Sequence, residues 1–96
     1  MIVSVFARTL RPGVSLQQFV EAWAPEGDEP YPAGVEIAVD PTNDRRVLTI
    51  IRFDGSLGEL QAAMSKLIHP QSHRRLDDVV ASTALEGYYE TADIAV

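Results

Sequence analysis

Both histidines of the chain fall within one short segment. His69 and His73 are four positions apart, so a continuous helix would place both imidazole rings on one stripe of its surface. An imidazole titrates near neutral pH and can transfer protons there with little tuning by its environment. We expect His73, with His69 as the second candidate, to act as a catalytic base at the mouth of a cavity between the helices and the sheet. The alternative is that His73 packs in the interior while His69 faces solvent beside Pro70.

A carboxylate follows the histidines at helical spacing. Asp77 lies four positions after His73, and two imidazoles with a carboxylate are ligands typical of non-haem iron or zinc. However, Pro70 interrupts the register between the histidines, and Asp77 is rotated by about 80° from His69 on an ideal helix. We therefore expect no metal site, and expect Asp77 to pair with Arg74 on a solvated face.

Two arginines stand among apolar residues of predicted strands. Arg8 belongs to the segment 2–10, and Arg52 belongs to the segment 46–53. A guanidinium group at the rim of a cavity can hold a carboxylate or a phenolate oxygen through parallel hydrogen bonds. We take Arg8 as the third candidate catalytic residue. The alternative for both arginines is an ion pair with an acidic residue at the sheet edge or at the rim of a dimer.

Four aromatic residues are the candidate ligand-binding residues: Trp23, Phe6, Tyr31 and Tyr88. The helical spacing around Trp23 predicts a core position, and the alternative is a pocket wall with Tyr31 as a lid over a planar aromatic ligand. Tyr88 and Tyr89 should point to opposite faces of the last strand, so at most one of them can line a cavity.

Hydrophobic periodicity predicts the elements that position these residues. Alternation and β-branched residues predict four strands, at 2–10, 35–39, 46–53 and 83–91. Capping-box sequences begin helices after Ser15 and Ser56, and Pro25 ends the first helix. Pro70 should interrupt the second helix, which we expect to resume over 71–80. The predicted order is β-α-β-β-α-β.

This order predicts a ferredoxin-like α+β fold, with two helices on one face of a four-stranded antiparallel sheet. The strands 2–10 and 46–53 are apolar on both faces and should therefore be central. Because the helices cover one face only, the other would expose a larger apolar patch than a monomer usually carries. We expect a symmetric homodimer that packs these bare sheet faces together. The alternative is a monomer in which some strands are mispredicted.

Length and composition exclude several classes of protein. The 96 residues predict one domain spanning 1–96, and a net charge of −6 argues against a nucleic-acid-binding protein. The absence of cysteine removes disulfides, thiolate metal ligands and cysteine nucleophiles. The sequence has neither a phosphate-binding glycine loop nor a Gly-x-Ser-x-Gly elbow. It also shows no signal peptide and no apolar run long enough to cross a bilayer, so we expect a cytoplasmic protein without membrane association.

The chain resembles the dimeric α/β-barrel proteins, particularly the antibiotic-biosynthesis-monooxygenase-like and stress-responsive barrel families. The element order, the strand Ile2-Val3-Ser4-Val5-Phe6-Ala7-Arg8 and the break His69-Pro70-Gln71-Ser72-His73 carry this resemblance over nearly the whole chain. Such proteins include cofactor-free oxygenases of aromatic or quinol compounds, haem-degrading enzymes, lactone isomerases and proteins without known activity. The haem-degrading branch typically carries an asparagine on its first strand and a tryptophan on its third. This chain lacks both, which argues against haem degradation.

The resemblance implies a cofactor-free monooxygenase or isomerase that acts on a small aromatic or quinol-like metabolite. In this hypothesis His73 removes a proton, Arg8 or a tyrosine holds the resulting oxyanion, and Trp23 helps to exclude water. The alternative is a non-catalytic small-molecule-binding or assembly module of the same fold. That alternative predicts a filled interior, both histidines facing solvent and no pocket near Trp23.

Overall fold

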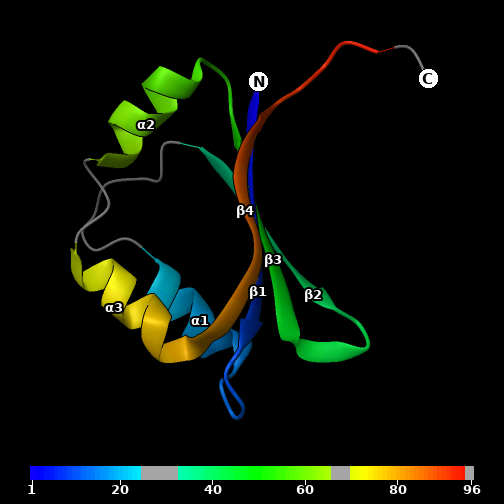
Figure 1. Ribbon diagram of the computed structural model, residues 1–96, viewed down its shortest axis with the longest axis vertical. Helices are drawn as coiled ribbons and strands as arrows, with labels where there is room; N and C mark the ends of the chain where they lie inside the picture. The colour runs from blue at the N-terminus through cyan, green and yellow to red at the C-terminus, as the bar shows by residue number, and fades with distance from the viewer. Residues whose placement is uncertain (25–32, 66–69, 95–96) are drawn as a thin grey trace.

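The computed structural model describes residues 1–24, 33–65 and 70–94, with the backbone alone at residues 70–73. In these ranges, helices lie on one face of a four-stranded antiparallel sheet (Figure 1). The strands are β1 (Ile2–Leu10), β2 (Gly34–Asp40), β3 (Asn43–Phe53) and β4 (Val80–Glu90), and the helices are α1 (Leu16–Trp23), α2 (Leu57–Ser65) and α3 (Pro70–Val79). The predicted ferredoxin-like α+β fold is confirmed.

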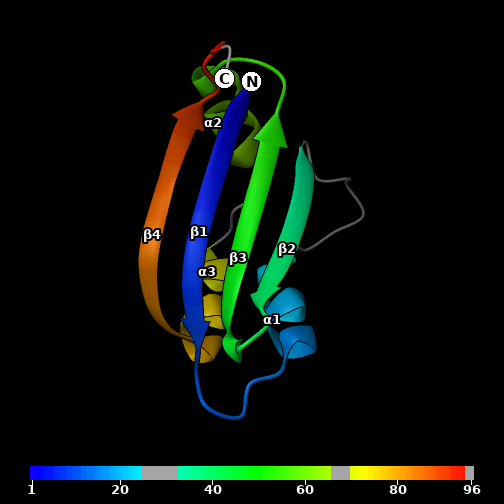
Figure 2. The same ribbon diagram turned by 90° about the vertical axis from the view of Figure 1, so that its right-hand side faces the viewer.

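The strand order of the sheet is β2-β3-β1-β4, so β1 and β3 are the central strands, as predicted (Figure 2). β1 pairs antiparallel with β3 and with β4, and β2 and β3 form the predicted hairpin. Each central strand is hydrogen-bonded to a strand on either side and carries apolar residues on both faces of the sheet. This double-sided pattern is what a central strand requires when both faces of the sheet are to be covered.

Local sequence signals set the start of α1. Gly13 has a φ of 83°, a left-handed conformation that favours glycine in the turn after β1. The Ser15 Oγ accepts a hydrogen bond from the Gln18 amide at 3.1 Å, and the Gln18 Oε1 accepts one from the Ser15 amide at 2.8 Å. This is the predicted capping box, which satisfies two amides that the first helical turn leaves free.

The second capping box forms only in part. The Glu59 amide donates to the Ser56 Oγ at 3.1 Å, as predicted, but the Ser56 hydroxyl rather than its amide donates to the Glu59 carboxylate, also at 3.1 Å. α2 ends at Ser65, and Pro70 is the first residue of α3, so the helix restarts there as expected. Proline suits this first position because it has no amide hydrogen to satisfy.

Two strands, β3 and β4, begin three residues earlier than the sequence predicts. β3 begins at Asn43 rather than at Arg46, and β4 begins at Val80 rather than at Thr83. β3 begins with the polar and charged residues 43–46, which lack the apolar alternation typical of a strand. β4 follows α3 directly, so no turn residues mark where it begins. β4 also ends at Glu90, one residue short of the predicted Thr91, whose amide donates to the Met1 carbonyl at 3.0 Å.

The core has its centre where α1 and α3 meet the sheet. Leu10, Phe19 and Val47 are buried and in contact, and Leu76, Val79 and Val80 pack against them, together with other partly buried residues. A second group of buried residues lies toward the other end of the sheet and consists of Ile2, Ile51 and Leu60.

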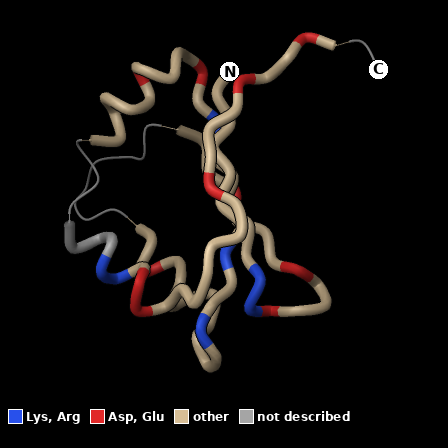
Figure 3. The backbone as a smooth tube through the Cα atoms, in the orientation of Figure 1, with Lys and Arg blue, Asp and Glu red and all other residues tan. Residues whose placement is uncertain are grey.

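Arginine side chains tie the helix ends to the rest of the fold. Arg75 of α3 donates to the carbonyls of Ala22 and Ala24 at the end of α1, at 3.4 and 3.1 Å. Arg11 donates from two guanidinium nitrogens to the Asp77 carbonyl near the end of α3, at 3.1 and 3.0 Å. These donors satisfy carbonyl groups that the last turn of a helix leaves free. Figure 3 shows most arginines at the end of the sheet that α1 and α3 cover.

The opposite face of the sheet carries no helix of the described residues (Figure 1). Its central residues are Val3, Val5, Ala7, Leu48 and Ile50, which are half-buried, and Leu85 and Tyr89 of β4 are exposed. This surface is called the bare face below. None of the helices in the described part of the chain is long and apolar enough to span a membrane.

Phe19→Ala tests the position of the core. Phe19 is fully buried, so its truncation should lower the free energy of unfolding by about 3–5 kcal/mol. Leu16→Ala is the matched control on the same helix, because Leu16 is 40% exposed and should cost less than about 1.5 kcal/mol. Urea unfolding at one fixed protein concentration measures both. Equal losses would contradict this core.

Candidate functional site

Polar residues gather on the face of the sheet that the helices cover. The register places Phe6 of β1 between Thr49 of β3 and Glu86 of β4, in one row across the sheet. Arg8 lies one step further along the same face of β1, and Ser4 one step back, opposite Tyr88. Arg8, Phe6, Glu86, Thr49, Ser4 and Tyr88 form a group that we call the inner site.

Arg8 is the charged centre of the inner site. Its guanidinium carbon lies 4.5 Å from the centre of the Phe6 ring and 6.0 Å from that of Phe19, distances at which a cation is attracted to an aromatic face. Its Nη1 is buried and has no hydrogen-bond partner among the described residues. Burial lowers the pKa of the Arg8 guanidinium, and the charge of Glu86 acts in the opposite direction.

A bulge in the sheet adjoins this arginine. β1 and β4 change register between Ala7, which pairs with Leu85, and Arg8, which pairs with Thr83, so Ala84 is the extra residue. Bulges bend a strand and redirect neighbouring side chains, and they are frequent beside functional sites.

Two buried hydroxyl groups lie on the same face. Thr49 is fully buried, and its Oγ1 has no hydrogen-bond partner among the described residues. Ser4 is also buried, but its hydroxyl donates to the Gly87 carbonyl at 3.3 Å. A buried polar group without a partner costs stability, so the unmet Arg8 and Thr49 donors mark a place where a ligand with acceptor oxygens would be favoured.

The inner site can therefore bind an anionic oxygen next to an aromatic surface. The guanidinium supplies a fixed positive charge, the Thr49 hydroxyl is a further donor, and Phe6 offers a ring face. Glu86 limits the net charge of the site, which makes it suited to one anionic group rather than to several.

The structure places the other candidate residues as follows. Trp23 is partly buried against the cluster of Leu10, Phe19 and Val47, where helical spacing predicted it. Tyr88 lies on the inner face and is 45% exposed, and Tyr89 points to the bare face, so the two tyrosines do face opposite ways. The roles of Trp23 and Tyr88 in binding a ligand stay predictions.

Several candidates lie outside the described residues. Tyr31 and His69 fall in the undescribed ranges, and His73 belongs to α3 but its side chain is not described. Asp77 is exposed at the end of α3, where its backbone carbonyl accepts hydrogen bonds from Arg11. Within the described ranges, no three side chains of the His, Asp and Glu types cluster as metal ligands.

Arg52 and Arg8 do not act together, although both were candidates for holding an anion. Arg52 pairs with Val3 in the register, which puts it on the bare face, and it forms an ion pair with Glu36 at 2.8 Å. Glu86 and Thr49 were not identified from the sequence. Their positions beside Phe6 depend on the register between distant strands, for which the sequence holds no local signal.

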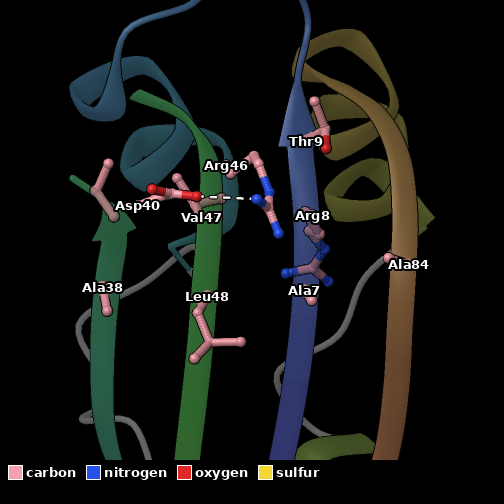
Figure 4. Close-up of a pocket in the computed structure, with 10 residues that line it drawn as sticks. Ala7, Arg8, Thr9, Ala38, Asp40, Arg46, Val47, Leu48 and Ala84 are labelled. Carbon is pink, nitrogen blue, oxygen red and sulfur yellow. Dashed lines mark hydrogen bonds and ion pairs between the residues drawn. The ribbon is translucent and has the colours of Figure 1, made fainter. Parts of the chain in front are cut away.

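An open pocket of about 360 Å³ lies on the bare face (Figure 4). Ala7, Ala38, Ala84 and Leu48 line it, and an ion pair between Arg46 and Asp40 closes one side at 3.0 Å. The Thr42 amide and hydroxyl, and to a lesser degree the Arg46 charge, lower the pKa of Asp40, so its carboxylate stays ionised at neutral pH.

Solved structures with the same fold cover almost the whole chain. A candidate antibiotic biosynthesis monooxygenase from Chloroflexus aurantiacus J-10-fl is 11% identical, with a TM-score of 0.69 over 99% of this chain and 96% of its own. An uncharacterised NIPSNAP domain protein from Burkholderia xenovorans is 14% identical, with a TM-score of 0.67 over 100% and 99% of the two chains.

A dimeric protein of unknown function and ferredoxin-like fold from Bacteroides fragilis NCTC 9343 is 16% identical, with a TM-score of 0.57 over 94% and 95%. No protein-family model matches the chain, and no curated protein matches it. At these identities the likeness concerns the fold. The chain therefore shares the ferredoxin-like α+β fold of these structures, the fold that its sequence pattern predicted.

Thr49→Val tests whether the inner site contains an unmet donor. Valine keeps the shape of threonine and removes the unpartnered hydroxyl, so the free energy of unfolding should rise by about 1 kcal/mol. Ser4→Ala is the control, because it removes a hydroxyl that has a partner and should lower stability by about 0.5–1 kcal/mol. Chemical unfolding compares the two, and a loss of stability in Thr49→Val would contradict the unmet donor.

Proposed function

We propose that this protein is a homodimeric α/β-barrel protein that binds a small planar aromatic or quinol-like anion at the inner site. We further propose that it acts on this ligand as a cofactor-free monooxygenase or isomerase. The observation that carries the proposal is the position of Arg8, a partly buried guanidinium with a free Nη1 beside an aromatic ring.

An anionic ligand would resolve the energetic problem that Arg8 presents. Burial disfavours its charge, and the described residues provide no ion-pair partner for it. A phenolate or carboxylate oxygen at Nη1 would supply both the missing hydrogen bond and the opposite charge. Phe6 would contact the flat part of such a ligand, which favours a planar molecule over a compact anion such as phosphate.

The proposed reaction uses the chain's own residues for proton transfer and charge stabilisation. His73 would remove a proton from the bound phenol, and Arg8 would stabilise the resulting oxyanion. In the monooxygenase case the electron-rich anion would add dioxygen at a ring carbon that bears hydrogen, and the resulting hydroperoxide would collapse to a quinone carbonyl with loss of one water, so that the substrate itself supplies the electrons. In the isomerase case the proton that His73 removes would be returned to a carbon of the anion instead of to its oxygen. Trp23, packed on the core cluster near the end of α1, would help to exclude water.

The bare face supports the dimeric part of the proposal. Its centre is apolar, and the described helices all lie on the opposite side of the sheet. Contiguous apolar surface of this kind is a common mark of an interface between subunits. The protein of this fold from Bacteroides fragilis is itself described as dimeric, which agrees with the proposal.

Arg8→Gln tests the binding site. Loss of the guanidinium should weaken the binding of hydroxybenzoate and naphtholate probes by about 10- to 100-fold, because a charge-assisted hydrogen bond contributes about 1.5–3 kcal/mol. Arg74→Gln is the matched control, since Arg74 is exposed on α3. Isothermal titration calorimetry measures both. Unchanged affinity in Arg8→Gln, alongside measurable binding in the wild type, would overturn this site.

His73→Ala separates catalysis from binding. If His73 is the base, turnover of a hydroquinone or naphthol, followed by oxygen consumption, should fall by about 10²- to 10⁴-fold while probe affinity changes little. Full turnover in this variant would remove His73 from the mechanism. Binding without turnover in the wild type, over the whole probe panel, would favour the non-catalytic binding module instead.

A further inference from the structure

Large and small residues lie on opposite edges of the bare face. The β4 edge presents Leu85, which is 41% exposed, and Tyr89, which is 51% exposed. The β2 edge presents Ala38, which lines the pocket, and Gly34. Each exposed large side chain thus has a small counterpart at the same level on the far edge of the sheet.

The register makes this correspondence specific. Ala38, Leu48, Ala7 and Leu85 lie in one row across the four strands, and Gly34, Arg52, Val3 and Tyr89 lie in another. Consider a twofold axis that runs parallel to the strands, between β3 and β1, in the plane between two facing sheets. It places each row of the second copy opposite the same row of the first copy, with the order of the strands reversed. In a face-to-face dimer with this axis, β4 of one copy lies over β2 of the other. Leu85 then meets Ala38, and Tyr89 meets Gly34.

From this arrangement we infer that a second copy of the chain fills the bare-face pocket with its Leu85, and that this contact sets the register of the dimer. The inference rests on the homodimer proposed above and adds which strands and which residues meet.

A twofold axis that runs across the strands fits the same surface less well. It would place β2 over β2 and β4 over β4, so the exposed leucines and tyrosines of two copies would crowd together. That crowding requires the axis at the level of Gly87. With the axis at the level of Thr49, one residue away, the row that contains Arg46 would instead lie over the row that contains Arg52, which brings like charges face to face. The residue of β2 that faces Ala38 would be Gly34 or Glu36, so the pocket would receive no large apolar side chain from that strand.

Charge also favours the axis along the strands. The charged side chains of the bare face stand on β2 and β3 as two ion pairs, Arg46 with Asp40 and Arg52 with Glu36. The face is therefore balanced in a chain whose net charge is −6, so two copies can approach there with the least repulsion. The strand that would cover β2, which is β4 of the second copy, presents the uncharged Leu85, Gly87 and Tyr89 on this face.

The area is sufficient for a specific dimer. Four strands spaced by about 4.8 Å, each about 30 Å long, present a face of roughly 600 Å². Two such faces bury roughly 1,200 Å², which reaches the lower bound of specific interfaces.

Paired cysteines test the register directly, because the natural chain contains no cysteine. In the variant Ala38→Cys with Leu85→Cys, the two sites of one copy are three strand spacings apart, roughly 14 Å, too far for a disulfide within the chain. Mild oxidation should therefore give a covalent dimer on a non-reducing gel. Disulfides that join two facing sheets are known to form across such an interface.

Matched variants define the controls. Each single cysteine variant should remain a single chain on the gel. Ala38→Cys with Glu86→Cys should also remain a single chain, because Glu86 lies on the helix-covered face next to Leu85. Gly34→Cys with Tyr89→Cys repeats the test at the other end of the sheet, where a side chain at residue 34 meets backbone only at ordinary contact distance, 3.8 Å.

The outcomes are distinct. Cross-linking of both double variants supports the inference. Cross-linking of Ala38→Cys alone would show β2 over β2 and overturn it. If light scattering finds wild-type dimers but neither double variant cross-links, this register is wrong while the homodimer stands. If the wild type is a monomer, the proposed homodimer fails as well.

Discussion

A four-stranded sheet that is apolar on both faces needs cover on both faces, and the described helices of this chain lie on one face only. Val3, Val5 and Ala7 of β1 alternate with Ile2, Ser4 and Phe6, so this central strand contributes to two surfaces at once. On the helix side its residues meet Phe19 and the core cluster. On the other side no helix within the described part of the chain covers them. The fold, the candidate site and the proposed dimer all follow from this asymmetry.

Residues 7–9 of β1 contribute both to the inner site and to the pocket on the bare face. Ala7, Arg8 and Thr9 all line the bare-face pocket, and the guanidinium of Arg8 lies near the Phe6 and Phe19 rings of the inner site. The bulge at Ala84 lies beside both. Packing of a second copy against the pocket would therefore press on the strand that carries the arginine. The hydrogen bonds of Arg11 to the Asp77 carbonyl and of Arg75 to the Ala24 carbonyl hold the ends of α3 and α1 in place beside this region. The site is therefore built on helices and strands rather than on loops.

The fold could be predicted from the sequence because its signals are local. Alternation over 47–53 gave the faces of β3 correctly, Ser15 with Gln18 marked the start of α1, and Pro70 marked the restart of the helix. The site could be predicted only in part. Arg8 stands out as a charge among apolar residues, but Glu86 and Thr49 become its neighbours through pairings between strands far apart in the chain. The register shift at Ala84, which decides the partner of Arg8 on β4, leaves no mark in the local pattern.

The central claim is that the bare face is buried between two copies of the chain. Sedimentation equilibrium of the unmodified protein at micromolar concentration tests it most directly. The account predicts a species of about 21 kDa, twice the 10.5 kDa of one chain, that persists in high salt because its interface is mainly apolar. A species of 10.5 kDa across the whole concentration range would contradict it.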